Sequence, residues 1–467
     1  MAKPDRKSVL LLGYSGYGKA LSGVDQAIRG LVATLPSEYQ VDIPVPSWEK
    51  GELQYQVERL RSDTFDRIDA AVHQRMQAHP LNRTGTALPI PNYFLSDRGL
   101  LHPYLDHTWN EQTDSKETPA TSDPIDSTST NPTIRSSAVD SSVAKKLEKR
   151  TDEQDMAIRG QARIPLKTWI KKHTKSLTDS IAADKKYDII HAHDWTSFPA
   201  AEQVTAKHGG QLIAHFHSIE ADRQPPEKQH NAIRKIEKRA LKKATKVLTV
   251  SHYAKEQLRK YYGLRKKETT VLYNRIQEKR KHSIEKKQTY FGNKHKKTIL
   301  FLGRVSAQKG PYVLLDTAKT YLQYDQHVVF KVVGDGPLLR HLMMEVRNHG
   351  LSAYFEFKPA IPHDQVHDEF LEADILFAPS VSEPFSMVMM EAVLAGLPIV
   401  CSEQVGFLEL MPWALHTDYR DSDQLAEYLY ALIHYPALRE DLLARMSSTL
   451  PDLFKKEVSL HRIYEML

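Results

Sequence analysis

Two glutamates, Glu383 and Glu391, stand eight residues apart in a segment whose pattern predicts a loop followed by a helix. The apolar run Ile375–Phe377 ends at a turn. Pro384 is typical of a first helical position because the amide it lacks would have no partner there. At a rise of about 1.5 Å per residue the two carboxylates would lie roughly 12 Å apart. That exceeds the roughly 5–9.5 Å between carboxyl groups that act on one glycosidic bond. It suits the two ends of an extended anion held at a helix start, such as a sugar nucleotide.

The segment EPFSMVMMEAVLAGLPIV, which begins at Glu383, resembles the donor-binding signature of retaining GT-B glycosyltransferases of the family-four group, the glycogen and sucrose synthase relatives. The resemblance implies that Glu383 contacts the donor sugar and that Glu391 contacts the ribose. Backbone amides between them, at Phe385, Ser386 and Met387, would meet the diphosphate. Without the strand before it and the Gly-Leu-Pro stop after it, an amphipathic helix with two solvated carboxylates would be the simpler interpretation.

Two cations, Arg304 and Lys309, follow another predicted strand within the glycine-flanked stretch Gly303–Gly310. Arg binds a diphosphate as a fork and Lys binds it as a point charge, so the pair could stabilise the charge that develops on a leaving nucleotide. The stretch is similar to the family's Gly-Arg…Lys-Gly diphosphate site, and surface cations on a loop are the alternative. With two cations present and no Asp-X-Asp or His/Cys ligand pattern in the sequence, we expect neither a metal nor another cofactor.

Further candidate residues lie at the ends of predicted strands. His217 resembles the family histidine beside the donor sugar, and a structural strand-end histidine is the alternative. His193 and Asp194 resemble the HAHDW stretch of glycogen-synthase-like members, with structural and catalytic roles equally open. Gly334 is expected in a turn near the nucleotide base. Gly23, in a Ser-Gly-Val where relatives commonly have Gly-Gly-Val, is expected near the donor phosphate, with a tight turn as the alternative. The predicted catalytic residues are His217, Arg304, Lys309 and Glu383, and the predicted donor-binding residues are Gly23, Arg304, Lys309, Gly334, Glu383, Phe385, Ser386, Met387 and Glu391.

Apolar runs alternating with helical patterns predict an α/β protein. The resemblance implies the GT-B architecture, two Rossmann-like, doubly wound domains facing each other across a cleft. Residues 1–275 are expected to form the N-terminal acceptor domain, with a disordered insertion at about 107–156 that is too polar to bury a core. Residues 276–297 form a basic linker and 298–445 the C-terminal donor-binding domain. A C-terminal helix in 446–467 is expected to return toward the first domain.

Composition is ordinary for a soluble globular protein, with 41% hydrophobic and 26% charged residues. The single cysteine, Cys401, excludes an intrachain disulfide and fits a reducing compartment. No apolar stretch approaches the roughly 18 residues that span a bilayer, and the apolar run near the N-terminus is too short for a signal peptide. We therefore expect a cytoplasmic protein.

The net charge of +6 is unevenly distributed. The segment Gln277–Thr298 holds eight Lys or Arg against two Glu, and Arg234–Lys246 is also basic. A solvated face or linker is the simplest interpretation, and peripheral contact with anionic lipid headgroups is the alternative. No nucleic-acid-binding motif accompanies these segments, so we expect no nucleic-acid partner.

The resemblance predicts transfer of a hexose from a nucleotide-sugar donor to a sugar, glycan, lipid or small-molecule acceptor, with retention at the anomeric carbon. One alternative is a sugar-nucleotide-binding protein that has lost catalysis, although Arg304, Lys309, Glu383 and Glu391 are all present. Another is a phosphorylase or epimerase of the same fold, but no motif for a pyridoxal lysine supports a phosphorylase.

Overall fold

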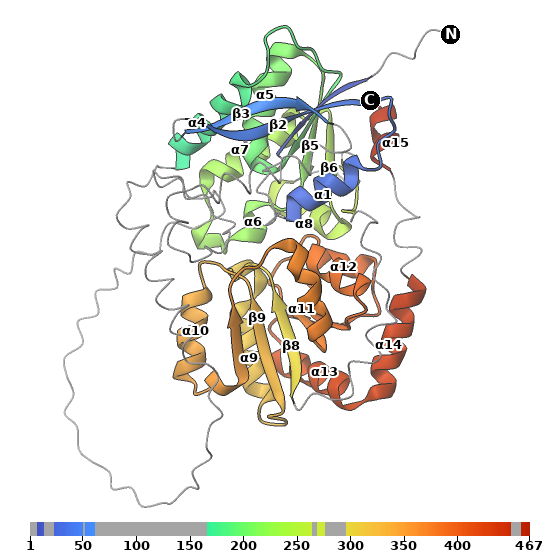
Figure 1. The fold of residues 1–467 in the computed structure, drawn as a ribbon. Coiled ribbons are helices and arrows are strands. Elements are labelled where there is room, and N and C mark those ends of the chain that lie inside the picture. The colour runs from blue at the N-terminus through green and yellow to red at the C-terminus, as the bar shows by residue number, and fades with distance from the viewer. Residues whose placement is uncertain are drawn as a thin grey trace, which may run out of the picture.

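The computed structural model describes residues 7–13, 23–49, 52–60, 166–263, 269–275, 296–449 and 459–467. These residues form two α/β domains, one above the other in Figure 1, each built on one sheet. The predicted insertion at 107–156 and residues 276–295 of the predicted linker lie outside the described residues.

The first sheet has the strand order β3-β2-β1-β4-β5-β6-β7 among the described residues. All neighbouring strands are parallel except β2 and β3, which are antiparallel. The strands are β1 (Ser8–Leu12), β2 (Gln40–Glu49), β3 (Glu52–Arg59), β4 (Ile189–His193), β5 (Gln211–Phe216), β6 (Lys246–Thr249) and β7 (Thr269–Val271).

Strands β2 and β3 were not anticipated from the sequence. Val41, Ile43 and Val45 are buried, and so are Asp42 and Pro44 between them, so this part of the strand is covered on both faces. Pro44 argues against a strand in the sequence, because proline is rare in the middle of a sheet. It is tolerated because the recorded pairing of β2 with β1 ends at Asp42, so only β3 flanks the strand at Pro44.

The second sheet has the order β10-β9-β8-β11-β12-β13, and all its recorded pairs are parallel. The predicted α/β class with two predominantly parallel sheets is therefore confirmed. The strands are β8 (Lys297–Leu302), β9 (Val328–Val333), β10 (Phe355–Lys358), β11 (Ile375–Ala378), β12 (Ile399–Ser402) and β13 (Leu415–Thr417).

Helices cover both sheets (Figure 1). In the first domain they are α1 (Gly23–Val32), α4 (Leu166–Asp179), α5 (Asp194–His208), α6 (Glu220–Arg223), α7 (Asn231–Lys243) and α8 (His252–Tyr262). In the second they are α9 (Pro311–Tyr321), α10 (Leu339–Asn348), α11 (Val366–Glu372), α12 (Met387–Leu394), α13 (Ser422–His434) and α14 (Pro436–Thr449), and α15 (Leu460–Glu465) follows near the end of the chain.

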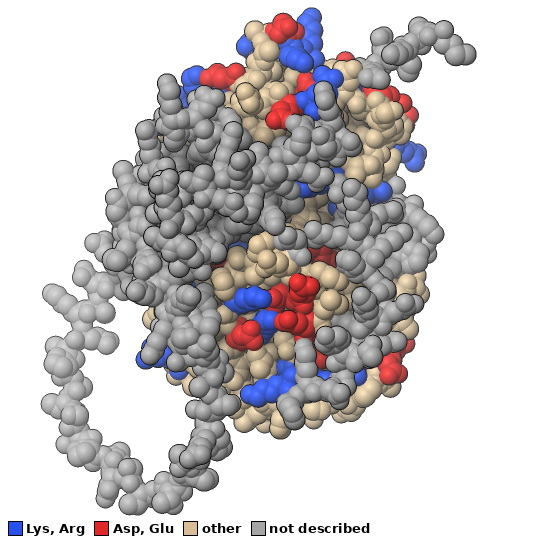
Figure 2. Space-filling view, in the orientation of Figure 1, with Lys and Arg blue, Asp and Glu red and all other residues tan. Residues whose placement is uncertain are grey.

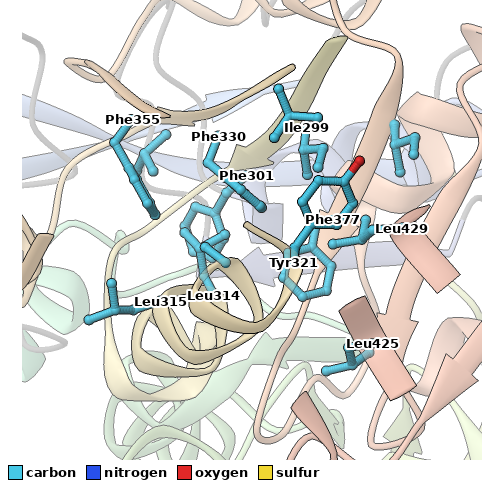
Figure 3. Packing of buried hydrophobic residues seen from close by; sticks show 14 of the residues in the cluster. Ile299, Phe301, Leu314, Leu315, Tyr321, Phe330, Phe355, Phe377, Leu425 and Leu429 are labelled. Atoms are coloured by element: carbon cyan, nitrogen blue, oxygen red, sulfur yellow. The ribbon is translucent and has the colours of Figure 1, made fainter. Parts of the chain in front are cut away.

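The core of the second domain shows why its strands read as continuous apolar runs. Strand β9 is buried at five of its six positions, as expected for a parallel strand covered on both faces. Aromatic rings pack together in this core, with Phe330 stacked on Phe355 at 5.4 Å and edge-on to Tyr321 at 5.9 Å. Figure 3 shows these rings between the sheet and the leucines of α9 and α13.

Helix α15 packs against the first domain although it follows the second in sequence (Figure 1). Leu460, Ile463 and Tyr464 are buried in the cluster that contains Val9 of β1. The Lys7 ammonium donates a hydrogen bond to the Tyr464 carbonyl at 2.9 Å. The chain therefore ties its last helix to its first strand.

The strand order reverses once in each sheet, between β1 and β4 and between β8 and β11. Ligands of open parallel sheets bind outside the carboxyl ends of the strands at such switch points. Arg304 and Lys309 follow β8, and Glu383 follows β11, so these residues flank the switch point of the second sheet. His193 ends β4 at the switch point of the first.

Candidate active site between the two domains

Lys309 and Glu383 are in direct contact, with the ammonium donating to the carboxylate. Lys309 ends the 3₁₀ helix η6 (Ala307–Lys309) and is followed by Gly310 at φ +69°. A Cβ on Gly310 would fall 1.9 Å from the Pro379 carbonyl oxygen, so only glycine lets the two loops approach this closely. The Glu383 side chain is 9% exposed and that of Lys309 is 23% exposed. The pair thus presents a partly accessible cation beside a buried carboxylate.

Arg304 lies where the loops after β8 and β9 cross. The Val305 amide donates to the Asp335 carbonyl at 2.9 Å. Gly334 has a φ of +147°, and a Cβ there would lie 1.9 Å from the Gly303 carbonyl oxygen. Gly334 therefore has a packing reason to be glycine, and this packing fixes the loop that carries Arg304. Contact of Gly334 with a nucleotide base stays a prediction.

Helix α12 begins at Met387, so the expectation that Pro384 opens it is wrong. The Ser386 hydroxyl caps the helix by accepting the Met389 amide at 3.3 Å. Upstream, Glu383 is held in a bridge with Val405, which keeps the backbone before the cap extended. Glu383 consequently lies in the approach to the helix and not in its first turn.

The residues expected to offer backbone amides to a diphosphate have buried side chains. Phe385 packs edge-on against Phe407 at 5.5 Å and belongs, with Met387, to one hydrophobic cluster. The Ser386 hydroxyl already serves as the cap. Their side chains are therefore committed to folding, and a ligand could meet only the backbone at Phe385, Ser386 and Met387.

Glu391, on α12, lies next to a histidine that the sequence analysis did not assign. Its Oε1 is 2.8 Å from Nε2 of His363, and both side chains are largely buried. His363 opens the 3₁₀ helix η8 (His363–Gln365) directly after Pro362. The Pro-His pair at a helix start was the available signal, but only the fold shows that it faces Glu391.

His217 follows β5 on the first domain and is held by two neighbours. Asp194 accepts the His217 amide at 2.8 Å and has a φ of +58°, the one positive value of a non-glycine residue in the described chain. Nδ1 of His193 lies 2.8 Å from Nε2 of His217. Burial lowers the pKa of His217 and the nearby Asp194 carboxylate opposes this shift, so the imidazole is held in its neutral form at pH 7. Asp194 thus fixes the backbone and His193 fixes the ring.

Hydrogen bonds from Asp222 and Tyr253 of the first domain reach the loop that carries Glu383. The Ser382 hydroxyl donates to Asp222 Oδ1 at 2.8 Å and lies 3.0 Å from the Tyr253 hydroxyl. Since the Ser382 proton goes to the carboxylate, Tyr253 acts as donor to Ser382. Burial raises the pKa of Asp222 to about 6, and the Glu383 charge contributes in the same direction. Sequence analysis missed these three residues.

A second link between the domains lies at the start of α8. The Glu409 carboxylate accepts the His252 amide at 2.8 Å and the Tyr273 hydroxyl at 2.9 Å. A carboxylate at a helix N-terminus pairs with unsatisfied amides and with the helix dipole. Ser251 also donates to the Pro384 carbonyl at 2.6 Å. These contacts place the first domain directly against the approach to α12.

The structure thus brings Lys309 to Glu383 and places Glu391 on the helix that follows. Arg304 lies in the loop fixed by Gly334, while His217 comes from the other domain. Gly23 is the first residue of α1. Residues 14–22 before it lie outside the described residues, and the predicted proximity of Gly23 to a phosphate stays a prediction.

No helix in the described part of the chain is long and apolar enough to cross a membrane. On the face shown in Figure 2, basic and acidic side chains lie next to one another. On α7, Arg239 pairs with Glu202 at 2.7 Å and Lys243 with the same carboxylate at 3.4 Å. Lipid contact through the basic segments stays a prediction.

Models of two sequence families match this chain in succession. The family described as Glycosyltransferase Family 4 matches residues 151–280, and that described as Glycosyl transferases group 1 matches residues 283–446. The two domains of this chain are thus similar, one after the other, to these two glycosyltransferase families. The first match ends with the first domain and the second spans the sheet that carries Lys309 and Glu383.

Individual known proteins show the same similarity. An uncharacterized glycosyltransferase of Methanocaldococcus jannaschii is 28% identical over 239 residues, which cover 48% of this chain and 60% of that protein. Sucrose-phosphate synthase from Thermosynechococcus elongatus matches with a TM-score of 0.52 at 19% identity, over 63% of this chain and 76% of that one. Anabaena HepE in complex with UDP-glucose matches with a TM-score of 0.50 at 18% identity, over 68% and 88%. These structures support the GT-B fold.

Proposed function

We propose that the protein transfers a hexose from a nucleotide-sugar donor to an acceptor hydroxyl with retention of anomeric configuration. The second domain binds most of the donor, and the acceptor enters from the side of the first domain. The contact between Lys309 and Glu383 at the switch point of the second sheet is the observation that supports this assignment most strongly.

The charged side chains of the donor site would each bind a different part of the donor. The ammonium of Lys309 and the guanidinium of Arg304 would neutralise the diphosphate, while Glu383 would accept hydrogen bonds from sugar hydroxyls. Before the donor binds, Glu383 offsets the positive charge of Lys309. A diphosphate entering the site would share that ammonium with Glu383. Glu391, beside His363, would accept from the ribose hydroxyls.

The chemistry follows from where charge develops. The bond between the anomeric carbon and the diphosphate oxygen breaks, and the acceptor oxygen bonds to that carbon on the same face. The acceptor proton passes to the departing phosphate. Negative charge grows on the leaving group, so fixed cations at Arg304 and Lys309 would stabilise the transition state more than the ground state. His217, neutral at pH 7 and held by His193, would orient the sugar without adding charge.

A donor panel tests this proposal. Thermal shifts of the purified protein with UDP-, ADP- and GDP-sugars would identify the donor, with UDP-glucose first because HepE was captured with it. Release of nucleoside diphosphate would then be compared for wild type, Arg304→Ala and Arg420→Ala. Arg420 is the matched control because its side chain is exposed in the same domain and pairs with Asp418.

We expect Arg304→Ala to lower turnover about 100- to 1000-fold, the scale of removing one preorganised donor to a transition state. Arg304→Lys should recover only part, because an ammonium does not reproduce the fork. Arg420→Ala should resemble wild type. Wild-type turnover in Arg304→Ala would disprove its role, and donor binding without turnover for any acceptor would favour a binding protein.

A further inference from the structure

Four histidines meet at the carboxyl ends of β4 and β5. His191 and His193 alternate on β4, and His215 and His217 alternate at the end of β5, so each pair points to one face of the sheet. The strands are parallel, with His193 directly opposite His215. The ring centroids of His191 and His215 lie 5.3 Å apart, and those of His193 and His215 lie 4.9 Å apart. Each pair is visible in the sequence as His-X-His, but only the pairing of β4 with β5 brings the two pairs together.

Two nitrogens of this group have no hydrogen-bond partner among the described residues. They are Nε2 of His193 and Nε2 of His215, and both side chains are almost completely buried. Buried polar atoms in native proteins are nearly always satisfied, so the orphaned Nε2 of His193 beside three more imidazoles calls for a ligand. At His215 the nitrogen that faces His191 is Nδ1, not the orphaned Nε2. Three imidazole nitrogens in one place are typical of a transition-metal site.

The spacing of the nitrogens fits that interpretation. One ring nitrogen from each of His191, His193 and His215 lies within 4.8 Å of the other two. Nε2 of His191 and Nδ1 of His215 are 3.2 Å apart. Two nitrogens bound tetrahedrally to one zinc at about 2.0–2.1 Å are separated by about 3.3 Å, so this pair already has the spacing of adjacent ligands. His193 would need to move by roughly 1.5 Å to complete the triangle, which a small side-chain rotation provides.

The Nδ1 atoms of two of these rings have partners that fix the orientation of the ring. Nδ1 of His191 lies 2.8 Å from the Tyr464 hydroxyl, and Nδ1 of His193 lies 2.8 Å from Nε2 of His217. Metal-ligating histidines normally donate their second N–H to such an acceptor, which orients the ring.

We propose that His191, His193 and His215 bind one divalent transition-metal ion of the zinc type in the core of the first domain. Neutral imidazoles favour zinc and its neighbours over magnesium or calcium. The buried Asp194 carboxylate, next in sequence to His193, offsets part of the charge. The ion would join β4 to β5 and, through Tyr464, hold α15 against the first domain. This assignment is independent of the proposed transfer reaction.

Metal content and thermal stability test the proposal on the full chain. Protein produced with zinc in the medium and dialysed against metal-free buffer should retain about one zinc per chain by elemental analysis. After the metal is stripped with a chelator, zinc at a hundredfold excess over its dissociation constant should raise Tm by roughly 5–10 °C. Magnesium should not. Cobalt added to the stripped protein should give the intense visible absorption of a tetrahedral site.

A matched pair of variants locates the ion. His193→Gln should lose the retained zinc and the zinc-dependent rise in Tm. His208→Gln should keep both, because His208 is a buried histidine of the same domain whose Nδ1 faces the Lys185 carbonyl at 2.7 Å, outside the group. Retention of stoichiometric zinc by His193→Gln would overturn the assignment. If that variant fails to fold, the wild-type titrations decide alone, since no zinc uptake and no change in Tm would equally overturn it.

Discussion

The two walls of the candidate active site are built from different chemistry. The wall on the second domain carries charged groups in contact, Lys309 with Glu383, and places Glu391 beside His363. The wall on the first domain presents His217, backed by other buried imidazoles that are neutral at pH 7. A charged wall suits the anionic donor that we propose. A wall whose imidazole side chains are neutral, called the uncharged wall whether or not these rings hold a metal ion, suits a sugar and an acceptor hydroxyl.

Burial explains why the walls differ. Lys309 remains partly exposed, so its charge keeps some hydration while Glu383 offsets the rest. The imidazoles at His193 and His215 are sealed from water, and burial lowers the pKa of both rings well below the usual value. Asp222 is the exception on the first-domain wall. Its carboxyl is buried with a raised pKa, yet it reaches across to Ser382.

The largest expected effect falls on the charged wall. Lys309→Ala should lower turnover about 100- to 1000-fold because it removes the cation that we propose faces the leaving diphosphate. The double variant Lys309→Ala with Glu383→Gln should lose less than the product of the single losses, since the two side chains are in contact. Steady-state release of nucleotide measures both, and Lys319→Ala, on the surface of α9, is the control. Strictly multiplicative losses would show that the contact does not matter for the reaction.

A smaller effect is expected at the other end of the same wall. Glu391→Ala should weaken binding of the nucleoside diphosphate by about 1.5–3 kcal/mol, the scale of hydrogen bonds to a charged group. His363→Ala should weaken it less, because we place His363 behind the carboxylate and not against the ribose. Calorimetry measures both, with the exposed Glu427→Ala on α13 as control. Unchanged affinity in Glu391→Ala would remove the ribose assignment.

Asp222 sharpens the comparison through pH. Its raised pKa of about 6 means that the protonated carboxyl favours the folded state. That stabilisation is complete below the unfolded value of 3.8 and is lost as pH rises through about 6, amounting to at most about 3 kcal/mol. Asp222→Asn keeps a neutral side chain, so its Tm relative to wild type should rise between pH 5 and pH 8. Melting curves at pH 5 and pH 8 test this. If the difference in Tm between the variant and wild type were the same at both pH values, Asp222 would not ionise in the folded protein between them.

The charged wall was largely visible in the sequence because its residues lie in short local motifs. Arg304, Lys309 and the Glu383–Glu391 segment each follow a recognisable strand. The start of α12 was misplaced, because the bridge of Glu383 to Val405 depends on a segment some twenty residues away. Local patterns therefore predicted which residues form this wall, but not how the chain enters the helix.

The uncharged wall was mostly invisible for a related reason. His193 and His215 meet only because β4 and β5 pair in one register, and Tyr464 joins them only because α15 returns to the first sheet. The bonds of Asp222 to Ser382 depend further on how the two domains are placed. None of these relations has a fixed spacing along the chain.

The smallest expected effect tests whether the uncharged wall extends to α15 through the Tyr464 hydroxyl. Tyr464 is completely buried, and its hydroxyl lies 2.8 Å from Nδ1 of His191. Tyr464→Phe keeps the ring and leaves one buried nitrogen unpaired, so it should lower stability by about 1–2 kcal/mol. This corresponds to a fall in Tm of roughly 2–8 °C for a domain of this size.

The loss of stability in Tyr464→Phe should not depend on pH. Burial raises the pKa of Tyr464 and lowers that of His191, so neither group titrates between pH 6 and pH 9. The loss should therefore be constant in this range, unlike the effect of Asp222→Asn. Melting of Tyr464→Phe beside Tyr435→Phe, an exposed tyrosine of the second domain, measures it. If the two variants melted alike, the Tyr464 hydroxyl would contribute nothing to holding α15, and the wall of imidazoles would end at His191.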